Sequence, residues 1–146
     1  MKPSAITDCL KRCLALQPLV GWPKWQCPTN PIARLELRHS GSESISYWVP
    51  WIYEEGAMGW EHLFDEIDDH IALCLWQDHF FAYLAGHSHN HEAALFVSCD
   101  ETGWGVTLES AMSGYLVESR RRPTLIEAVL DVCEQIQKGT DAQHQT

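Results

Sequence analysis

The stretch AALFVSCDETGWGVTLES, residues 93–110, limits the possible folds more than any other part of the chain. Residues 93–97 form a short apolar run that contains Phe96 and Val97, and apolar and polar residues alternate over 104–110, so both segments are predicted to form strands. Thr102 and Gly103 lie between the two segments and supply the turn of a hairpin. The chain is therefore predicted to contain an antiparallel sheet.

Three segments place apolar residues at helical spacing and are predicted to form helices. The first spans residues 4–17 and ends at Pro18 and Gly21, and the second spans 57–77. Pro123 opens the third, because proline suits the first helical turn. The buried stripe of this third helix is predicted to comprise Leu125, Ile126, Val129, Leu130, Cys133 and Ile136.

Further strands are predicted over 33–39 and 45–53, as a second hairpin in which Pro50 breaks or ends the second strand. A short strand is expected at 115–118. The segment FFAYLA, residues 80–85, either extends the central helix or forms a strand, and we favour the strand.

These elements follow the order α-ββ-α-ββ-α and predict an α+β fold, with three helices packed on an antiparallel sheet of about four to five strands. Residues 1–138 are expected to form a single domain and the polar residues 139–146 a disordered tail. The Trp-bearing segment 21–31 contains three prolines and is expected to form an irregular loop.

Charge is distributed unevenly along the chain, whose net charge is −10. Between His39 and Ser119 there is no lysine or arginine, whereas this interval holds fourteen Asp and Glu residues. A large field of one sign repels nucleic acid and acidic membranes and attracts basic surfaces. We call residues 39–119 the acidic interval and expect its partner to be a basic protein surface.

Aromatic residues lie among the carboxylates of the acidic interval, as in many protein-binding hot spots. The segment FDEIDDH, residues 64–70, is predicted to form part of a docking face whose carboxylates imitate phosphates. A solvated surface that keeps the protein soluble is the alternative. The predicted partner-binding residues are Trp51, Tyr53, Glu54, Glu55, Trp60, Glu61, Asp65, Glu66, Asp68 and Asp69.

Two histidine patterns suggest metal chemistry. In GHSHNHE, residues 86–92, His87, His89 and His91 alternate, so on a strand all three would point to one side and could bind Zn²⁺. A polar loop is the alternative. On the central helix, His62, Glu66 and His70 recur every four residues, but this is not the HExxH motif, and a solvated acidic face is favoured.

The remaining polar and sulfur-containing residues indicate no catalytic motif. The six cysteines form no CxxC pair and are expected to be reduced core residues. Arg120, Arg121 and Arg122 either pair with phosphate or an acidic partner, or act as a counterweight to the acidic interval. No apolar run is long enough for a signal peptide or membrane span, so a cytoplasmic location is expected.

The last third of the chain carries a family resemblance, through Trp104, Val106, Pro123, Ile126, Ala128 and Leu130. A hairpin with a Trp-x-Val second strand followed by a helix led by proline resembles the C-terminal part of phage ABA-sandwich domains, over residues 94–137. The resemblance implies an α/β sandwich of phage origin. It implies no particular activity, because that family offers no catalytic motif to carry over.

Charge, size and this resemblance together predict a non-enzymatic inhibitor of phage or mobile-element origin. It would be an anti-CRISPR-type protein that covers the basic surface of a host nucleic-acid-binding defence complex as a nucleic-acid mimic. A metal-binding protein or metalloenzyme using His87, His89 and His91 is one alternative. A structural or regulatory homo-oligomer, such as a homodimer, is another.

Overall fold

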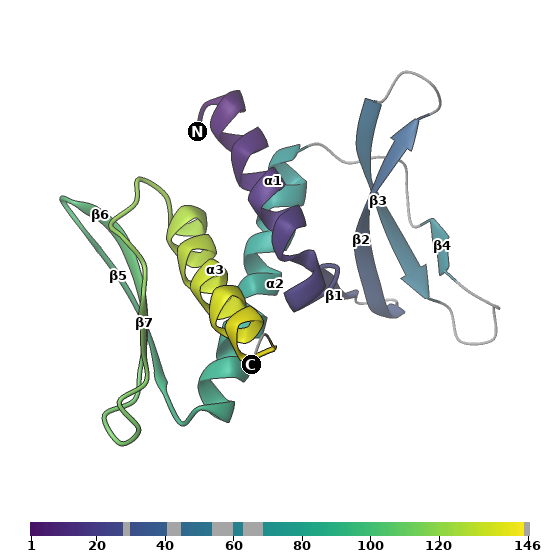
Figure 1. Cartoon of the computed structure of the whole chain (residues 1–146). Helices are drawn as coiled ribbons and strands as arrows, with labels where there is room; N and C mark the ends of the chain where they lie inside the picture. Colours follow the sequence, from purple (N-terminus) through teal and green to yellow (C-terminus); the bar gives the residue numbers. More distant parts are fainter. Residues whose placement is uncertain (28–29, 41–44, 54–59, 63–68, 145–146) are drawn as a thin grey trace. The chain divides into compact units, whose positions relative to one another are not determined.

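The computed structural model describes residues 1–27, 30–40, 45–53, 60–62 and 69–144. In chain order its elements are α1 (Pro3–Val20), β1 (Lys24–Cys27), β2 (Asn30–Ser40), β3 (Ile45–Tyr53), β4 (Trp60–His62), α2 (Asp69–Asn90), β5 (Ala94–Asp100), β6 (Gly103–Glu109), β7 (Leu116–Glu118) and α3 (Leu125–His144) (Figure 1). The predicted α+β class is confirmed. The strands form two antiparallel sheets, of four and three strands, where the sequence predicts one sheet of four to five.

The chain divides into two compact units. The first comprises Met1–Leu10 and Gly21–His79, and the second comprises Lys11–Val20 and Phe80–Thr146. Helices α1 and α2 each contribute residues to both units. That residues 1–138 act as a single domain stays a prediction.

The sheet of the first unit has the order β1-β2-β3-β4. Its central hairpin pairs β2 with β3 from Ala33 opposite Ile52 to Ser40 opposite Ile45, which confirms the second predicted hairpin. Pro50 lies within β3 opposite Leu35 and does not end the strand. Within the described residues β4 pairs with residues 51–53 of β3, and Pro50 lies just outside this described pairing.

The predicted irregular loop over 21–31 is partly wrong, because residues 24–27 form the edge strand β1. Pro23 lies just before β1, and Pro31 is the second residue of β2. At strand ends and edges a missing N–H removes little of the ladder, so prolines there do not prevent pairing. Helix α1 likewise continues past Pro18 to Val20, and Gly21, at φ +78°, ends it.

Helix α2 differs most from the sequence prediction. Residues 60–62, predicted as helix, form β4, and the helix that begins at Asp69 continues through 80–85, where we favoured a strand. Buried Leu73, Trp76, Phe80 and Leu84 recur every three or four residues, so FFAYLA continues an existing helical stripe. The segment 86–92, read as a loop or strand, is also helical up to Asn90.

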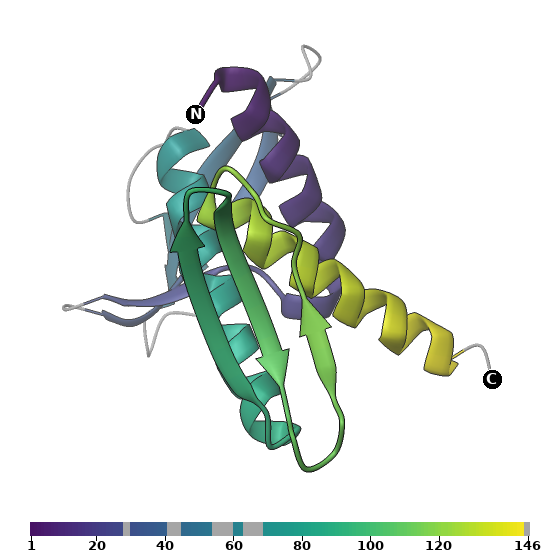
Figure 2. The same cartoon turned by 90° about the vertical axis from the view of Figure 1, so that its left-hand side faces the viewer.

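The sheet of the second unit has the order β5-β6-β7 and packs against α3, which lies behind β6 and β7 (Figure 2). Val106 and Leu108 of β6 are fully buried. They face α3, whose predicted apolar stripe packs on β6. Five residues of that stripe are buried: Ile126, Val129, Leu130, Cys133 and Ile136. This confirms both the hairpin over 93–110 and the strand at 116–118.

The ends of α3 are displaced from their predicted positions. The helix begins at Leu125, with Thr124 as its cap: the Thr124 hydroxyl bonds to Glu127, and the Thr124 carbonyl accepts from the Ala128 N–H. Pro123 therefore precedes the first turn. At the other end the helix extends to His144, through residues predicted as a disordered tail, because propagation of an existing helix costs far less than starting one.

The five cysteines whose side chains are described are free thiols. Cys9, Cys13 and Cys133 are buried as predicted, and burial raises the pKa of Cys133 to about 12. Cys74 and Cys99 are exposed, so their assignment to the core was wrong.

Among the described residues, no helix combines the length and the apolar composition that crossing a membrane requires.

Candidate functional site

The predicted docking face lies largely outside the described residues. Glu54, Glu55, Asp65, Glu66 and Asp68 are among the residues that the structure does not describe. Asp69 begins α2 and is exposed.

The aromatic members of the predicted face lie on two paired strands. Trp51 and Tyr53 are in β3, and Trp60 and Glu61 are in β4. The register places Tyr53 opposite Trp60 and Trp51 opposite His62. The backbone therefore brings these three aromatic positions together on neighbouring strands, whereas the sequence predicted Trp51 and Tyr53 on a strand and Trp60 on the central helix.

The acids of the acidic interval whose side chains are described all face solvent. The set comprises Asp69, Asp78, Glu92, Asp100, Glu101, Glu109 and Glu118, and each is exposed. Asp100 alone among them has a described ion-pair partner, Arg121, at 3.5 Å, and both side chains are about half exposed. Hydrogen bonds from Thr102, together with Arg121, lower the pKa of Asp100. These seven acids thus keep their negative charge at the surface.

The histidine cluster forms on a helix and not on a strand. His87 and His91 lie one turn apart, with ring centroids 4.2 Å from each other, whereas His89 is exposed and outside the cluster. Tyr115 stacks on His91 at 4.6 Å, and its hydroxyl lies 2.7 Å from Nε2 of His87 in a hydrogen bond. Tyr83 stacks on the other side of His87, at 5.9 Å.

Contacts between these aromatic rings join the C-terminal end of α2 to Tyr115, the residue that directly precedes β7. Burial, and to a lesser extent His91, lowers the pKa of His87, and burial raises the pKa of Tyr115. A pocket of about 200 Å³ beside it is lined also by Val117, Gln135 and Ile136. In the described part of the chain, no three His, Cys, Asp or Glu side chains converge as metal ligands. His62, now in β4, does not share a helix with His70.

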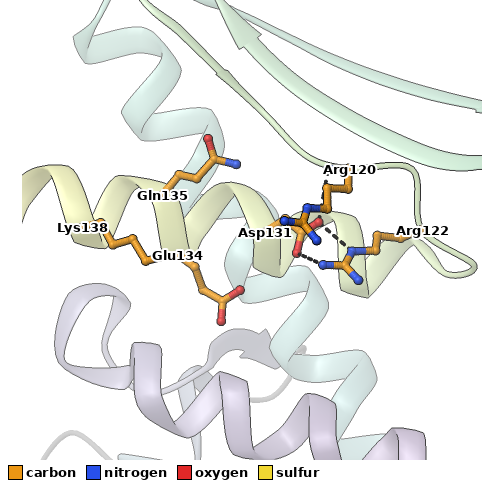
Figure 3. Close-up of a pocket in the computed structure, with 6 residues that line it drawn as sticks. All are labelled: Arg120, Arg122, Asp131, Glu134, Gln135 and Lys138. Atoms are coloured by element: carbon orange, nitrogen blue, oxygen red, sulfur yellow. Dashed lines mark hydrogen bonds and ion pairs between the residues drawn. The ribbon is translucent and has the colours of Figure 1, made fainter.

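The Arg122 side chain and the Arg120 backbone N–H are bound by a carboxylate that the sequence prediction missed, that of Asp131. Arg122 donates from Nε and Nη2 to both oxygens of Asp131, at 2.7 and 2.9 Å. Arg12 of α1 donates to Asp131 Oδ1 at 2.9 Å and also to Glu134. The backbone N–H of Arg120 donates to Asp131 Oδ2 at 3.2 Å; in Figure 3 dashed lines join Asp131 to Arg120 and Arg122.

Asp131 is ionised and central to this network. Its side chain is only 8% exposed. Burial acts to raise the pKa of Asp131, but the hydrogen bonds from Arg122 and Arg12 outweigh burial, so the pKa lies below its usual range. The sequence did contain a signal, because an aspartate between Leu130 and Val132 interrupts an apolar stripe, and a charge on a buried face requires a partner.

A pocket of about 410 Å³ lies beside this network (Figure 3). Its lining residues are Arg120, Arg122, Asp131, Glu134, Gln135 and Lys138. Both of its carboxylates are engaged by Arg12 or Arg122, and Gln135 donates to the Glu118 carbonyl at 2.6 Å. These interactions join α3 to α1 and β7, so the residues of this pocket serve primarily to hold the second unit together.

Comparison with known proteins found no matching family model, no matching curated protein and no matching solved structure. The resemblance of residues 94–137 to phage ABA-sandwich domains stays a prediction.

Proposed function

We propose that this protein is a non-enzymatic inhibitor that binds the basic surface of a nucleic-acid-binding complex through its acidic interval. A host defence complex of the kind that anti-CRISPR proteins inhibit is the proposed target. The protein would be of phage or mobile-element origin and would act in the cytoplasm of the host cell. It would compete with DNA or RNA for a groove rich in lysine and arginine.

One observation carries this proposal: every acid of the acidic interval with a described side chain is exposed. Two arginines outside the acidic interval are bound by carboxylates that also lie outside it. Arg12 and Arg122 pair with Asp131, and among the residues with described side chains Arg121 alone pairs with an acid of the interval, Asp100. The field of the interval therefore extends into solvent, where it attracts positively charged surfaces.

The mechanism is steric and electrostatic. Carboxylates at the spacing of a strand or helix take the place of phosphates on the target, and the folded chain then blocks entry of the nucleic acid. Exposed charge pairs are screened by salt, with a Debye length of about 8 Å at physiological ionic strength and about 3 Å at 1 M. Affinity is therefore expected to fall as the salt concentration rises.

A panel of purified guide-RNA-loaded nuclease complexes tests the proposal. Each is assayed for binding of its target DNA with and without the full-length protein, at low and high salt. We expect inhibition of at least one complex, lost at high salt. The triple variant Asp65→Lys, Asp68→Lys, Asp69→Lys should lose this inhibition by more than about tenfold in affinity, because like charges then face each other.

A charge-matched control separates the docking face from net charge. The triple variant Glu92→Lys, Glu101→Lys, Glu109→Lys changes the net charge equally in the second unit. If both triple variants lose inhibition equally, net charge and not the 64–70 segment drives binding. If inhibition survives the first triple variant at unchanged salt dependence, the electrostatic mechanism is wrong.

A further inference from the structure

Strand β5 is an open edge of the second sheet, because among the described residues it pairs with β6 alone. The direction of its free backbone groups follows from the hydrogen bonds of β6. Trp104 exchanges both backbone hydrogen bonds with Arg122, and Val106 accepts from the Ser119 N–H and donates to the Ser119 hydroxyl. Both residues of β6 thus direct their backbone groups away from β5.

The backbone groups that β5 presents at its edge can therefore be identified. Val97 lies opposite Val106, and Cys99 lies opposite Trp104. In an antiparallel pair, residues opposite each other either exchange hydrogen bonds or both point away from each other. The N–H and C=O groups of Val97 and Cys99, and by the same alternation those of Leu95, point to the open edge.

The side chains of β5 are also uncovered, on both faces of the sheet. Phe96 is 55% exposed on one face and Val97 is 44% exposed on the other. Val106, directly opposite Val97, is completely buried, because α3 covers β6 and β7. The seven-residue strand contains no lysine and no proline, the residues with which natural edge strands usually prevent pairing.

The charges at the ends of β5 determine which strand it can accept. Glu92 is exposed before its first residue, and Asp100 and Glu101 are exposed at its end, where Arg121 pairs with Asp100 and Glu101 has no described ion-pair partner. A second copy could pair with β5 antiparallel, with Val97 opposite Val97. Ala94 would then lie opposite Asp100 of that copy and Ala93 opposite Glu101, so that Glu92 would lie diagonally beside Glu101 of that copy. Like charges at close range oppose this pairing. A strand with basic residues at both ends is complementary.

We propose that the edge of β5 binds an extended segment of a partner protein, as an added strand with alternating apolar residues and with lysine or arginine at both ends. Main-chain hydrogen bonds to Leu95, Val97 and Cys99 supply affinity, and contacts with Phe96 and Val97 supply preference for apolar residues. The preference for a basic partner rests on the same charge as the proposed function, but the pairing itself does not involve residues 64–70.

A synthetic peptide of sequence KKVTVTVKK, labelled with a fluorophore, is the probe. Binding to the full-length protein is measured by fluorescence anisotropy, beside EEVTVTVEE and KKVTPTVKK. We expect KKVTVTVKK to bind, and both comparison peptides to bind at least about tenfold more weakly, because one carries like charges and the other lacks a central hydrogen-bond donor. Equal binding of KKVTVTVKK and KKVTPTVKK would show that charge alone is recognised, and would overturn the proposal.

Val97→Pro is the decisive variant, because the N–H that it removes points to the open edge and not to β6. An edge strand tolerates proline at such a position. We expect about tenfold weaker peptide binding, whereas Val97→Ala, which keeps the backbone N–H, should alter binding by less than about threefold. The matched control Leu116→Lys changes another exposed apolar residue, on β7, and should alter binding by less than about twofold.

Hydrogen exchange provides a second readout that does not depend on a variant. The peptide should slow exchange of the amides of Leu95, Val97 and Cys99, while the amides of Phe96 and Ser98 are already bonded within the sheet. Protection elsewhere only, or none, contradicts the proposal. If the protein alone is a dimer by sedimentation and Val97→Pro makes it monomeric, a second copy occupies the edge and the proposed partner is wrong.

The two proposals can fail separately. Loss of target inhibition in the 65/68/69 variant with unchanged peptide binding leaves both intact as distinct surfaces. Unaltered peptide binding by Val97→Pro overturns the β5 proposal and leaves the acidic-interval proposal standing.

Discussion

Helix α3 and strand β5 lie in the same unit but differ in where their charged and apolar side chains lie: those of α3 are largely buried, and those of β5 are largely exposed. Around α3, Asp131 is buried and accepts from two arginines and one backbone N–H. Along β5, acids and apolar side chains alike remain in solvent, with Phe96 and Val97 prominent among them. Groups that are satisfied within the fold stabilise it, whereas groups left open are free to meet a partner. The contrast separates the structural half of this unit from its candidate binding half.

Removal of the Asp131 carboxylate is expected to have the largest effect on stability. Asp131→Ala leaves Arg12, Arg122 and the Arg120 N–H without their shared acceptor. The expected loss is about 3 kcal/mol in the free energy of unfolding, near the lower end for a broken buried pair because the arginines are partly exposed. Urea denaturation followed by circular dichroism measures it.

The matched control for Asp131 is an acid at the open end of β5. Glu101→Ala should change stability by less than about 0.5 kcal/mol, because Glu101 is exposed. Similar losses for the two variants would mean that the Asp131 network does not anchor α3.

A second comparison uses two valines that face each other across β5 and β6. Val106→Ala should destabilise the protein by about 2 kcal/mol, since it leaves a cavity in a fully covered site. Val97→Ala, at a side chain that is 44% exposed, should cost only about 0.5 kcal/mol. Thermal denaturation of both variants checks this, and equal costs would show that β5 is covered in solution.

The regions that the sequence predicted well are those with a strong local pattern. The stripe from Ile126 to Ile136 and the hairpin over 93–110 each repeat their period several times, so one element type fits them best. The start of α3 was predicted at Pro123, two residues too early, because the bond between Thr124 and Glu127 was not foreseen. The short apolar segment 80–85 carries no such repeat, and its helical character emerges only when it is joined to Leu73 and Trp76.

The predictions that failed depended on contacts between distant residues. Residues 60–62 fit a helical pattern, but they pair with 51–53 in a sheet, which local spacing cannot reveal. The histidine motif changed meaning for the same reason: on a helix, His87 and His91 meet each other and Tyr115, and His89 points elsewhere. Which acids and aromatics form one surface likewise depends on the fold and not on their order in the chain.

The smallest expected effect on stability comes from the histidine cluster. His87 is neutral at neutral pH and gains a positive charge in a packed region as pH falls. Burial and His91 lower the pKa of His87 below 6.5, so the folded state favours neutral imidazole. Tyr83 and Tyr115 also face His87, and neither provides a negative charge near neutral pH. Below pH 6.5 the unfolded chain binds a proton at this position before the folded chain does. Stability is therefore present above pH 6.5 and declines as pH falls through the folded-state pKa.

His87→Gln should reduce this dependence on pH. Between pH 7.5 and 5.5 the wild-type protein should lose roughly 0.5 kcal/mol more than the variant, a modest value because His87 is partly open to solvent and its charge is screened. Other titrating groups are common to both proteins and cancel in the difference. His89→Gln, at an exposed position on the same helix, should retain the wild-type slope. If the free energy of unfolding depends on pH equally in the two variants, protonation of His87 does not destabilise the folded state. The end of α2 would then resemble the solvent-exposed surfaces of this unit more than its packed regions.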